Sequence, residues 1–85
     1  MAFLRDTQGG RVQIPEGQDV RDLAQFGFDR RATAIETIRS CVLFSEPNFQ
    51  GNECWIFCPP GGVRSIADLA QFAGRARSLF WARGG

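Results

Sequence analysis

The chain contains no histidine, no lysine and no tyrosine, and these absences narrow the classes of protein it can belong to. Without histidine the most frequent general base is missing, and no hydroxyl or thiol in the sequence has a recognisable base as its partner. There is also no phosphate-binding loop and no concentration of carboxylates that would shift one another's pKa. We therefore expect no enzymatic activity and no catalytic residues.

Because lysine is absent, all ten basic residues are arginines. Arginine is favoured where proteins bind phosphate or nucleic acid, since its guanidinium forms bidentate hydrogen bonds with phosphate oxygens. The nine carboxylates, however, are interspersed with the arginines, and the net charge is only +1. No stripe of like charge emerges, so the sequence predicts no nucleic-acid partner, and the arginine bias is compositional.

Long hydrophobic runs are absent as well. No segment approaches the roughly 18 consecutive apolar residues that a membrane span requires. The opening stretch, MAFLRDTQGG, lacks the basic and apolar regions of a secretory signal. The sequence therefore predicts no membrane association. It fits either a cytoplasmic protein or a mature or excised domain, and of these it favours the cytoplasm while leaving the localisation open.

The three cysteines cannot all pair with one another. If the strand at Cys41 pairs with the strand ending at Cys58 around a turn near Phe49 and Gln50, then Cys41 lies opposite Cys58. A disulfide between them requires Cα atoms within about 7 Å. The alternative is three buried thiols. The spacing of Cys54 and Cys58 also suits zinc, but without histidine and with only one further cysteine no closed four-ligand site is expected.

The chain repeats itself. Phe3 and Gly10 recur with the same spacing as Phe44 and Gly51, and the pentapeptide DLAQF occurs at residues 22–26 and again at 68–72. The sequence therefore predicts an internal duplication with halves at about 1–40 and 41–85. A unit of about 40 residues cannot bury its apolar face alone, so we expect both halves to form a single domain, 1–85.

Short apolar runs separated by glycine- and proline-rich turns predict strands. The runs are Phe3–Arg5, Arg11–Ile14, Thr33–Ile38, Cys41–Phe44, Cys54–Phe57 and Ser78–Trp81. Each DLAQF segment places an acid before an apolar pair at helical spacing, which predicts one short helical turn. About four strands in each half would give about eight in two sheets. We expect both tryptophans, Trp55 and Trp81, in the core.

The second half, beginning FSEPNFQG, resembles the Greek-key motif of the βγ-crystallins, of the microbial type. In that motif an aromatic residue opens the unit, a glycine follows seven positions later and a serine stands near the end. The resemblance covers nearly the whole chain, and it implies an all-β, two-sheet Greek-key β-sandwich with short helical turns and a structural role. The matching residues are Phe44, Glu46, Pro47, Asn48, Phe49, Gly51 and Ser78, with Phe3, Gly10 and Thr33 in the first half.

The motif also has a physical basis. A hairpin folded onto its own sheet brings backbone so close that only glycine fits, which predicts that role for Gly10 and Gly51. The hydroxyls of Thr33 and Ser78 can bond backbone groups that such a fold leaves unpaired.

The resemblance further implies calcium, since many microbial members bind it through a loop of two acids or amides, two variable residues and two hydroxyl residues. Calcium takes about six to eight oxygen ligands. The aligned stretches are residues 29–34, where Asp29 and Thr33 match, and 74–79, where only Ser78 matches. We therefore expect weak calcium binding at one or two sites. The first would combine Asp29, the Arg31 carbonyl, Thr33 and a carbonyl near Ser45. The second would combine the Ala76 carbonyl, Ser78 and a carbonyl near Leu4.

An alternative function stays open. Related small secreted Greek-key domains act as metalloprotease inhibitors or antifungal polypeptides, and these tend to carry an even number of disulfide-bonded cysteines. The odd cysteine count favours the structural domain. An exposed aromatic patch near Trp81 or the loop at residues 59–62 would favour the interaction protein. The sequence identifies no protein partner, and it fits a monomer or a weak homodimer.

Overall fold

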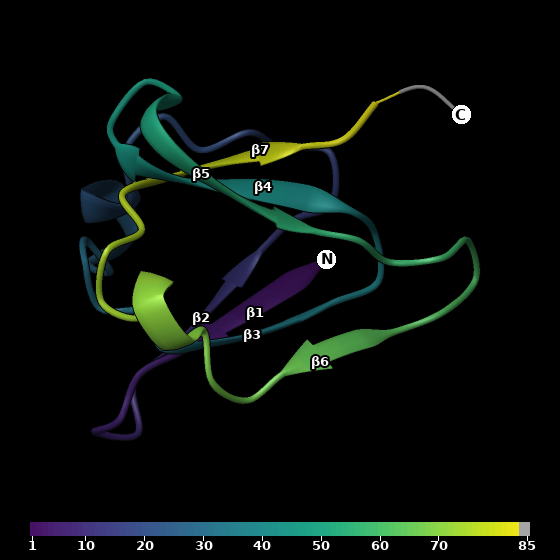
Figure 1. Ribbon diagram of the computed structural model, residues 1–85, viewed down its shortest axis with the longest axis horizontal. Helices are drawn as coiled ribbons and strands as arrows, with labels where there is room; N and C mark the ends of the chain where they lie inside the picture. The colour runs from purple at the N-terminus through teal and green to yellow at the C-terminus, as the bar shows by residue number, and fades with distance from the viewer. Residues whose placement is uncertain (84–85) are drawn as a thin grey trace.

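Two antiparallel β-sheets face each other across the core (Figure 1). The structure, a computed structural model, describes residues 1–83. The first sheet has the order β2-β1-β3-β6, with β1 at Ala2–Arg5, β2 at Arg11–Ile14, β3 at Ala34–Thr37 and β6 at Arg64–Ile66. The second has the order β5-β4-β7, with β4 at Cys41–Glu46, β5 at Gln50–Ile56 and β7 at Ser78–Trp81. The predicted all-β sandwich is confirmed.

Each half of the chain contributes to the sheet of the other half. Strand β6, from the second half, pairs with β3 of the first half and places Ile66 opposite Ile35. In return Val20, from the first half, forms a two-way backbone bridge with Leu79 of β7, with both N–H···O distances at 2.9 Å. The predicted count of about eight therefore corresponds, within residues 1–83, to seven strands and this bridge. The exchange makes one Greek-key sandwich of the two halves.

Both DLAQF segments form short 3-10 helices, as predicted. Helix η1 spans Leu23–Phe26, and the Asp22 carboxylate accepts a hydrogen bond from the Ala24 N–H at 3.0 Å. Helix η2 spans Ala70–Phe72, and the Asp68 carboxylate accepts from the Ala70 N–H at 2.8 Å. The acid at the start of each segment thus satisfies a backbone donor that the short helix leaves free. Among the described residues, neither helix is long and apolar enough to cross a membrane.

The core lies between the sheets and contains one tryptophan rather than the two predicted. Trp81 is fully buried, and its indole N–H donates to the Gln18 carbonyl at 2.9 Å. Trp55 is 54% exposed. The prediction was wrong for Trp55 because successive residues of a strand point to opposite faces. Its neighbour Ile56 occupies the core face of β5, which leaves Trp55 on the outer face.

Matching hydrogen bonds relate the two halves and fix how their loops correspond. The Thr33 N–H donates to the Arg5 carbonyl at 2.8 Å, as the Arg77 N–H does to the Phe44 carbonyl at 2.8 Å. Residues 29–34 therefore correspond to 73–78, one residue earlier than the stretch 74–79 taken from the sequence. Likewise Arg5, not Phe3, corresponds to Phe44. The predicted Phe3 frame was wrong because the alternation of buried residues sets the register of a strand, and the fully buried Leu4 takes the place of the fully buried Leu43.

The β4–β5 hairpin is also shifted from the predicted register. The turn lies at residues 47–49, earlier than predicted, because Glu46 pairs with Gln50. Together with an irregularity between Phe44 and Glu46, this places Cys41 opposite Ile56 instead of Cys58. A β-bulge of this kind inserts an extra residue into one strand. All three cysteines are free; Cys41 and Cys58 are buried and Cys54 is half-buried.

The folded hairpin corner requires a glycine at Gly51, as predicted. The residue has φ of +82°, and a Cβ there would lie 2.4 Å from the Ser45 Oγ. At Gly10 a Cβ would lie 2.5 Å from an Asp6 carboxylate oxygen. At Gly10 a side chain would have to displace the Asp6 and Arg31 side chains, whereas at Gly51 the backbone conformation opposes a side chain as well.

Candidate cation site at the loop end of the sandwich

The predicted calcium ligand Asp29 is held by two arginines. One carboxylate oxygen accepts a hydrogen bond from the Arg77 Nε at 2.9 Å, and the other lies 3.4 Å from the Arg30 Nε. The Asp29 side chain is 23% exposed and that of Arg77 is 29% exposed. The carboxylate that would have been the main calcium ligand is therefore already paired with positive charge.

Arg77 reaches a second carboxylate, on the β4–β5 hairpin. Its Nη1 lies 3.7 Å from a carboxylate oxygen of Glu46, next to the predicted ligand Ser45. The hydrogen bond from Arg77 to Asp29 raises the pKa of the guanidinium, and the charges of Asp29 and Glu46 add to this effect. The hydroxyl of Ser45 is engaged separately, since it accepts from the Asn52 N–H at 2.8 Å. Arg77 thus lies between two acids from different halves of the chain.

The hydroxyls of Thr33 and Ser78 close the hairpins of their own halves. Thr33 Oγ1 donates to the Arg5 carbonyl at 3.3 Å. Ser78 Oγ, which is fully buried, donates to the Glu46 carbonyl at 2.7 Å and accepts from the Phe49 N–H at 3.1 Å. The predicted bonding of a backbone group by the hydroxyl is seen at Ser78, whereas the Arg5 carbonyl that Thr33 Oγ1 reaches already accepts the Thr33 N–H.

The remaining predicted ligands lie apart from one another. The Ala76 carbonyl accepts the Arg30 N–H at 3.0 Å. Leu4 is buried in the middle of β1, between β2 and β3. Arg31 directs its guanidinium to the Gly27 carbonyl at 2.9 Å and to the Asp6 carboxylate. The structure therefore brings Asp29 to the Ser45–Glu46 corner and Thr33 to the Arg5–Asp6 corner, so the two predicted ligand sets are each divided.

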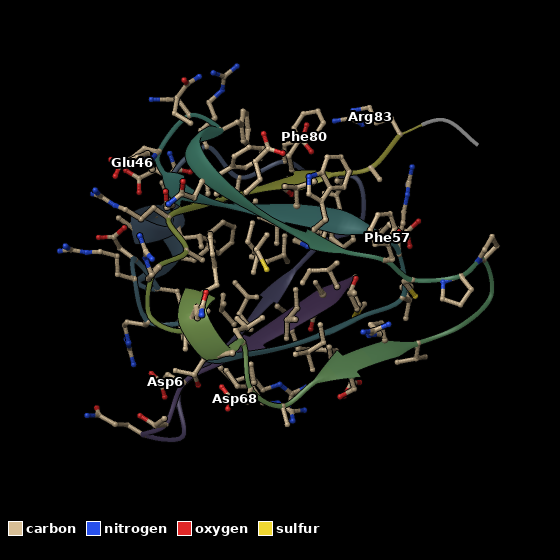
Figure 2. All side chains as sticks on the ribbon, in the orientation of Figure 1. Asp6, Glu46, Phe57, Asp68, Phe80 and Arg83 are labelled. Atoms are coloured by element: carbon tan, nitrogen blue, oxygen red, sulfur yellow. The ribbon has the colours of Figure 1, made fainter. Side chains whose placement is uncertain are left out.

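A second arginine–carboxylate pair closes the other corner. Figure 2 shows Asp6 and Glu46 at the same end of the sandwich, one beside each sheet. Burial acts to raise the pKa of Asp6, but hydrogen bonds from the Gly10 N–H, the Arg31 guanidinium and the Gln8 N–H outweigh it and leave the pKa below its usual value. Asp6 therefore stays ionised and paired at neutral pH.

These residues do not fit a calcium cage. Calcium needs several oxygens that are free to converge on the ion. Within residues 1–83 no group of three or more acidic, histidine or cysteine side chains is placed to hold a metal. The hollow beside Ser45 and Glu46 is lined instead by three arginines, Arg30, Arg75 and Arg77. The sequence analysis did not place Arg77, Glu46 and Asp6 in this region. Aligning the second loop one residue earlier, at 73–78, would have identified Arg77 as the counterpart of Thr33.

Two solved structures resemble this chain along nearly its whole length. A βγ-crystallin from Ciona intestinalis matches with a TM-score of 0.77 and 17% sequence identity, over 95% of this chain and 98% of that chain. The N-terminal domain of Protein S matches with a TM-score of 0.74 and 17% identity, over 95% of this chain and 93% of that chain. No family model and no curated protein sequence matches the chain. The chain therefore has the βγ-crystallin fold.

Proposed function

We propose that this chain is a structural domain of the βγ-crystallin type, without enzymatic activity, in which calcium binds only weakly. The observation that carries the proposal is the engagement of Asp29 by the Arg77 Nε at 2.9 Å. The matching hydrogen bonds of the two loops also support the internal duplication and a single domain built from both halves.

The positive charges at the loop end of the sandwich, the region formed by Asp29, Arg77 and Glu46, oppose the binding of a divalent ion. A guanidinium about 5 Å from a divalent ion lowers the affinity of the site by about one to two decades when the effective dielectric constant is between about 80 and 40. Arg30 and Arg77 both lie within contact distance of Asp29. An entering calcium ion must therefore displace guanidinium groups from its best ligand, and we expect binding no tighter than about 1 mM, at the weak end of protein calcium sites.

The proposal is tested on the unmodified sequence. Calcium is titrated by calorimetry into protein that has been stripped with a chelator, and thermal unfolding is followed by tryptophan fluorescence, in which exposure of the buried Trp81 reports unfolding, in the presence and absence of calcium. We expect no saturation below about 1 mM and no change of the unfolding midpoint at 0.1 mM, because an ion stabilises a protein only above its dissociation constant. Asp29→Ala should abolish whatever binding remains. A saturable heat at micromolar calcium would contradict the proposal.

A second candidate function is an interaction protein. One observation favours it: Trp55 and Phe57 are 54% and 68% exposed, and their rings stack 6.0 Å apart on the outer side of the β5–β4–β7 sheet. Figure 2 shows Phe57 at the end of this sheet next to the loop at residues 59–62. Exposed aromatic pairs of this kind are typical of partner surfaces. The patch adjoins the predicted loop but not Trp81, which is buried.

A further inference from the structure

We infer that the guanidinium of Arg77 takes the place of a metal ion at the loop end. It links the two halves of the domain by pairing with a carboxylate from each half, as a bound divalent cation would. The inference rests on the proposed function and attributes the weakness of calcium binding chiefly to one residue, Arg77. Arg77 comes from the loop of the second half, whereas Asp29 belongs to the corresponding loop of the first half and Glu46 to the hairpin of the second.

The position of Arg77 in its loop explains why it can take this role. Residues 73–78 correspond to 29–34, so Arg77 stands where the first loop has Thr33. The Thr33 side chain is short and reaches only the Arg5 carbonyl of its own hairpin. Arginine at the same position is long enough to reach the carboxylates beyond its own hairpin and presents several donors in a fixed plane. One change of residue type at this position therefore replaces a hydroxyl by a tethered positive charge.

The geometry is that of a bridging cation rather than of an isolated surface pair. Nε of Arg77 bonds Asp29 at 2.9 Å while Nη1 of the same guanidinium lies 3.7 Å from Glu46. The neighbouring Arg75 lines the same hollow but is exposed. The Arg31–Asp6 pair at the other corner also joins an arginine to a carboxylate, but both of its members belong to the first half. Of the two pairs at these corners, the one at Arg77 joins the two halves; Arg83 and Asp19 also pair across the halves, beyond β7.

The inference predicts that removing this one side chain creates a site for a divalent cation. In Arg77→Thr, the carboxylates of Asp29 and Glu46 lose their shared positive partner, and the threonine restores the residue type of the corresponding Thr33. Arg75→Thr is the matched control, since it removes the same charge from the same hollow without touching Asp29. Arg77→Lys keeps the charge at the bridging position.

The experiment measures calcium binding by calorimetry and the thermal midpoint by tryptophan fluorescence for all four proteins after chelator treatment. We expect Arg77→Thr to bind calcium at least about tenfold more tightly than the unmodified protein and to gain thermal stability at 1 mM calcium. Arg75→Thr and Arg77→Lys should behave like the unmodified protein. A folded Arg77→Thr that gains no affinity would overturn the inference, and so would an equal gain in Arg75→Thr, because net charge alone would then explain the result.

A second measurement without calcium covers the case in which Arg77→Thr folds poorly. The thermal midpoints of Asp29→Ala, Arg77→Thr and the double variant form a double-mutant cycle. If Arg77 acts through Asp29, the double variant loses less than the sum of the two single losses. Additive losses would refute the link. Failure of the proposed function gives a different result, because the unmodified protein would then already bind calcium tightly.

Discussion

The stability of this domain should fall in mildly alkaline solution because of a single buried thiol. Cys41 is fully buried, and burial, together with the nearby Cys54, raises the pKa of its thiol from 9.0 to about 12. The chain has no lysine and no tyrosine. Cysteine thiols are therefore the only side chains here that ordinarily lose a proton between about pH 8 and 11. This composition makes the effect of one thiol unusually easy to isolate.

The sign and size of this pH effect on stability follow from proton linkage. The thiol ionises near pH 9 in the unfolded chain but only near pH 12 in the folded one, so the unfolded state binds fewer protons between these values. The contribution of Cys41 is complete below pH 9 and is lost as the pH rises toward 12. One group changes the free energy of unfolding by at most about 1.4 kcal/mol per pH unit, which gives a loss of about 2 kcal/mol by about pH 10.5. For a domain of this size, that lowers the unfolding midpoint by roughly 8 to 16 °C.

The assay is urea unfolding between pH 8.5 and 10.5 in a reducing buffer, followed by tryptophan fluorescence. Cys41→Ala should be less stable at pH 8.5 because a buried atom is lost, yet its stability should change little as the pH rises. Cys54→Ala is the matched control. Burial also raises the pKa of this half-buried thiol, but its removal should flatten the profile less. Equal slopes for the unmodified protein and Cys41→Ala would refute the reasoning.

Two further predictions concern the hairpin corner of the second half. Gly51→Ala should lower the free energy of unfolding by at least about 2 kcal/mol, because φ is +82° and the new Cβ would lie 2.4 Å from Ser45 Oγ. The control Gly17→Ala, with the same φ but no atom within 4 Å, should lower it by only about 1 kcal/mol. Chemical denaturation of both measures the difference, and equal losses would rule out close approach at the corner. Ser78→Ala should lower the unfolding free energy by about 1 to 3 kcal/mol, because it leaves the Glu46 carbonyl and the Phe49 N–H without their partner. The exposed Ser65→Ala should change it by less than about 0.5 kcal/mol, and a similar small effect at Ser78 would show that the two bonds contribute nothing.

The strands that the sequence predicts are those whose own residues form an apolar run. Strand β6 was missed because it is three residues long, Arg64–Ile66, and only Ile66 is apolar. What makes it a strand is pairing with β3 across the boundary between the halves. The bridge at Val20 was missed for the same reason, since a single residue pair carries no pattern. Both omissions lie in the exchange between halves, which depends on distant contacts and not on local propensity.

The error at Trp55 has a different physical origin. In the run Cys54–Phe57 no polar residue marks the solvent side, so the sequence does not reveal which alternate positions point inward. The sheet decides this through register: Ile56 lies opposite Cys41 and Cys54 opposite Leu43, and those partners are core residues. Trp55 and Phe57 then necessarily point outward. A continuous apolar run thus predicted the strand correctly and its buried face only in part.

At the candidate site, the sequence shows which acids a loop contains but not what neutralises them. Asp29 was visible as a ligand because it stands in a recognisable loop position, whereas its partner Arg77 lies 48 residues away. Aligning Gly74 with Asp29 hid the correspondence of Arg77 with Thr33. The backbone corrects it, because Arg30 and Gly74 both have positive φ, at 53° and 73°, and so occupy the same loop position. Positive φ favours glycine but does not require it. A loop with glycine there and a loop with arginine there are therefore the same structure, and the residue three positions after each determines whether the neighbouring carboxylates meet a hydroxyl or a guanidinium.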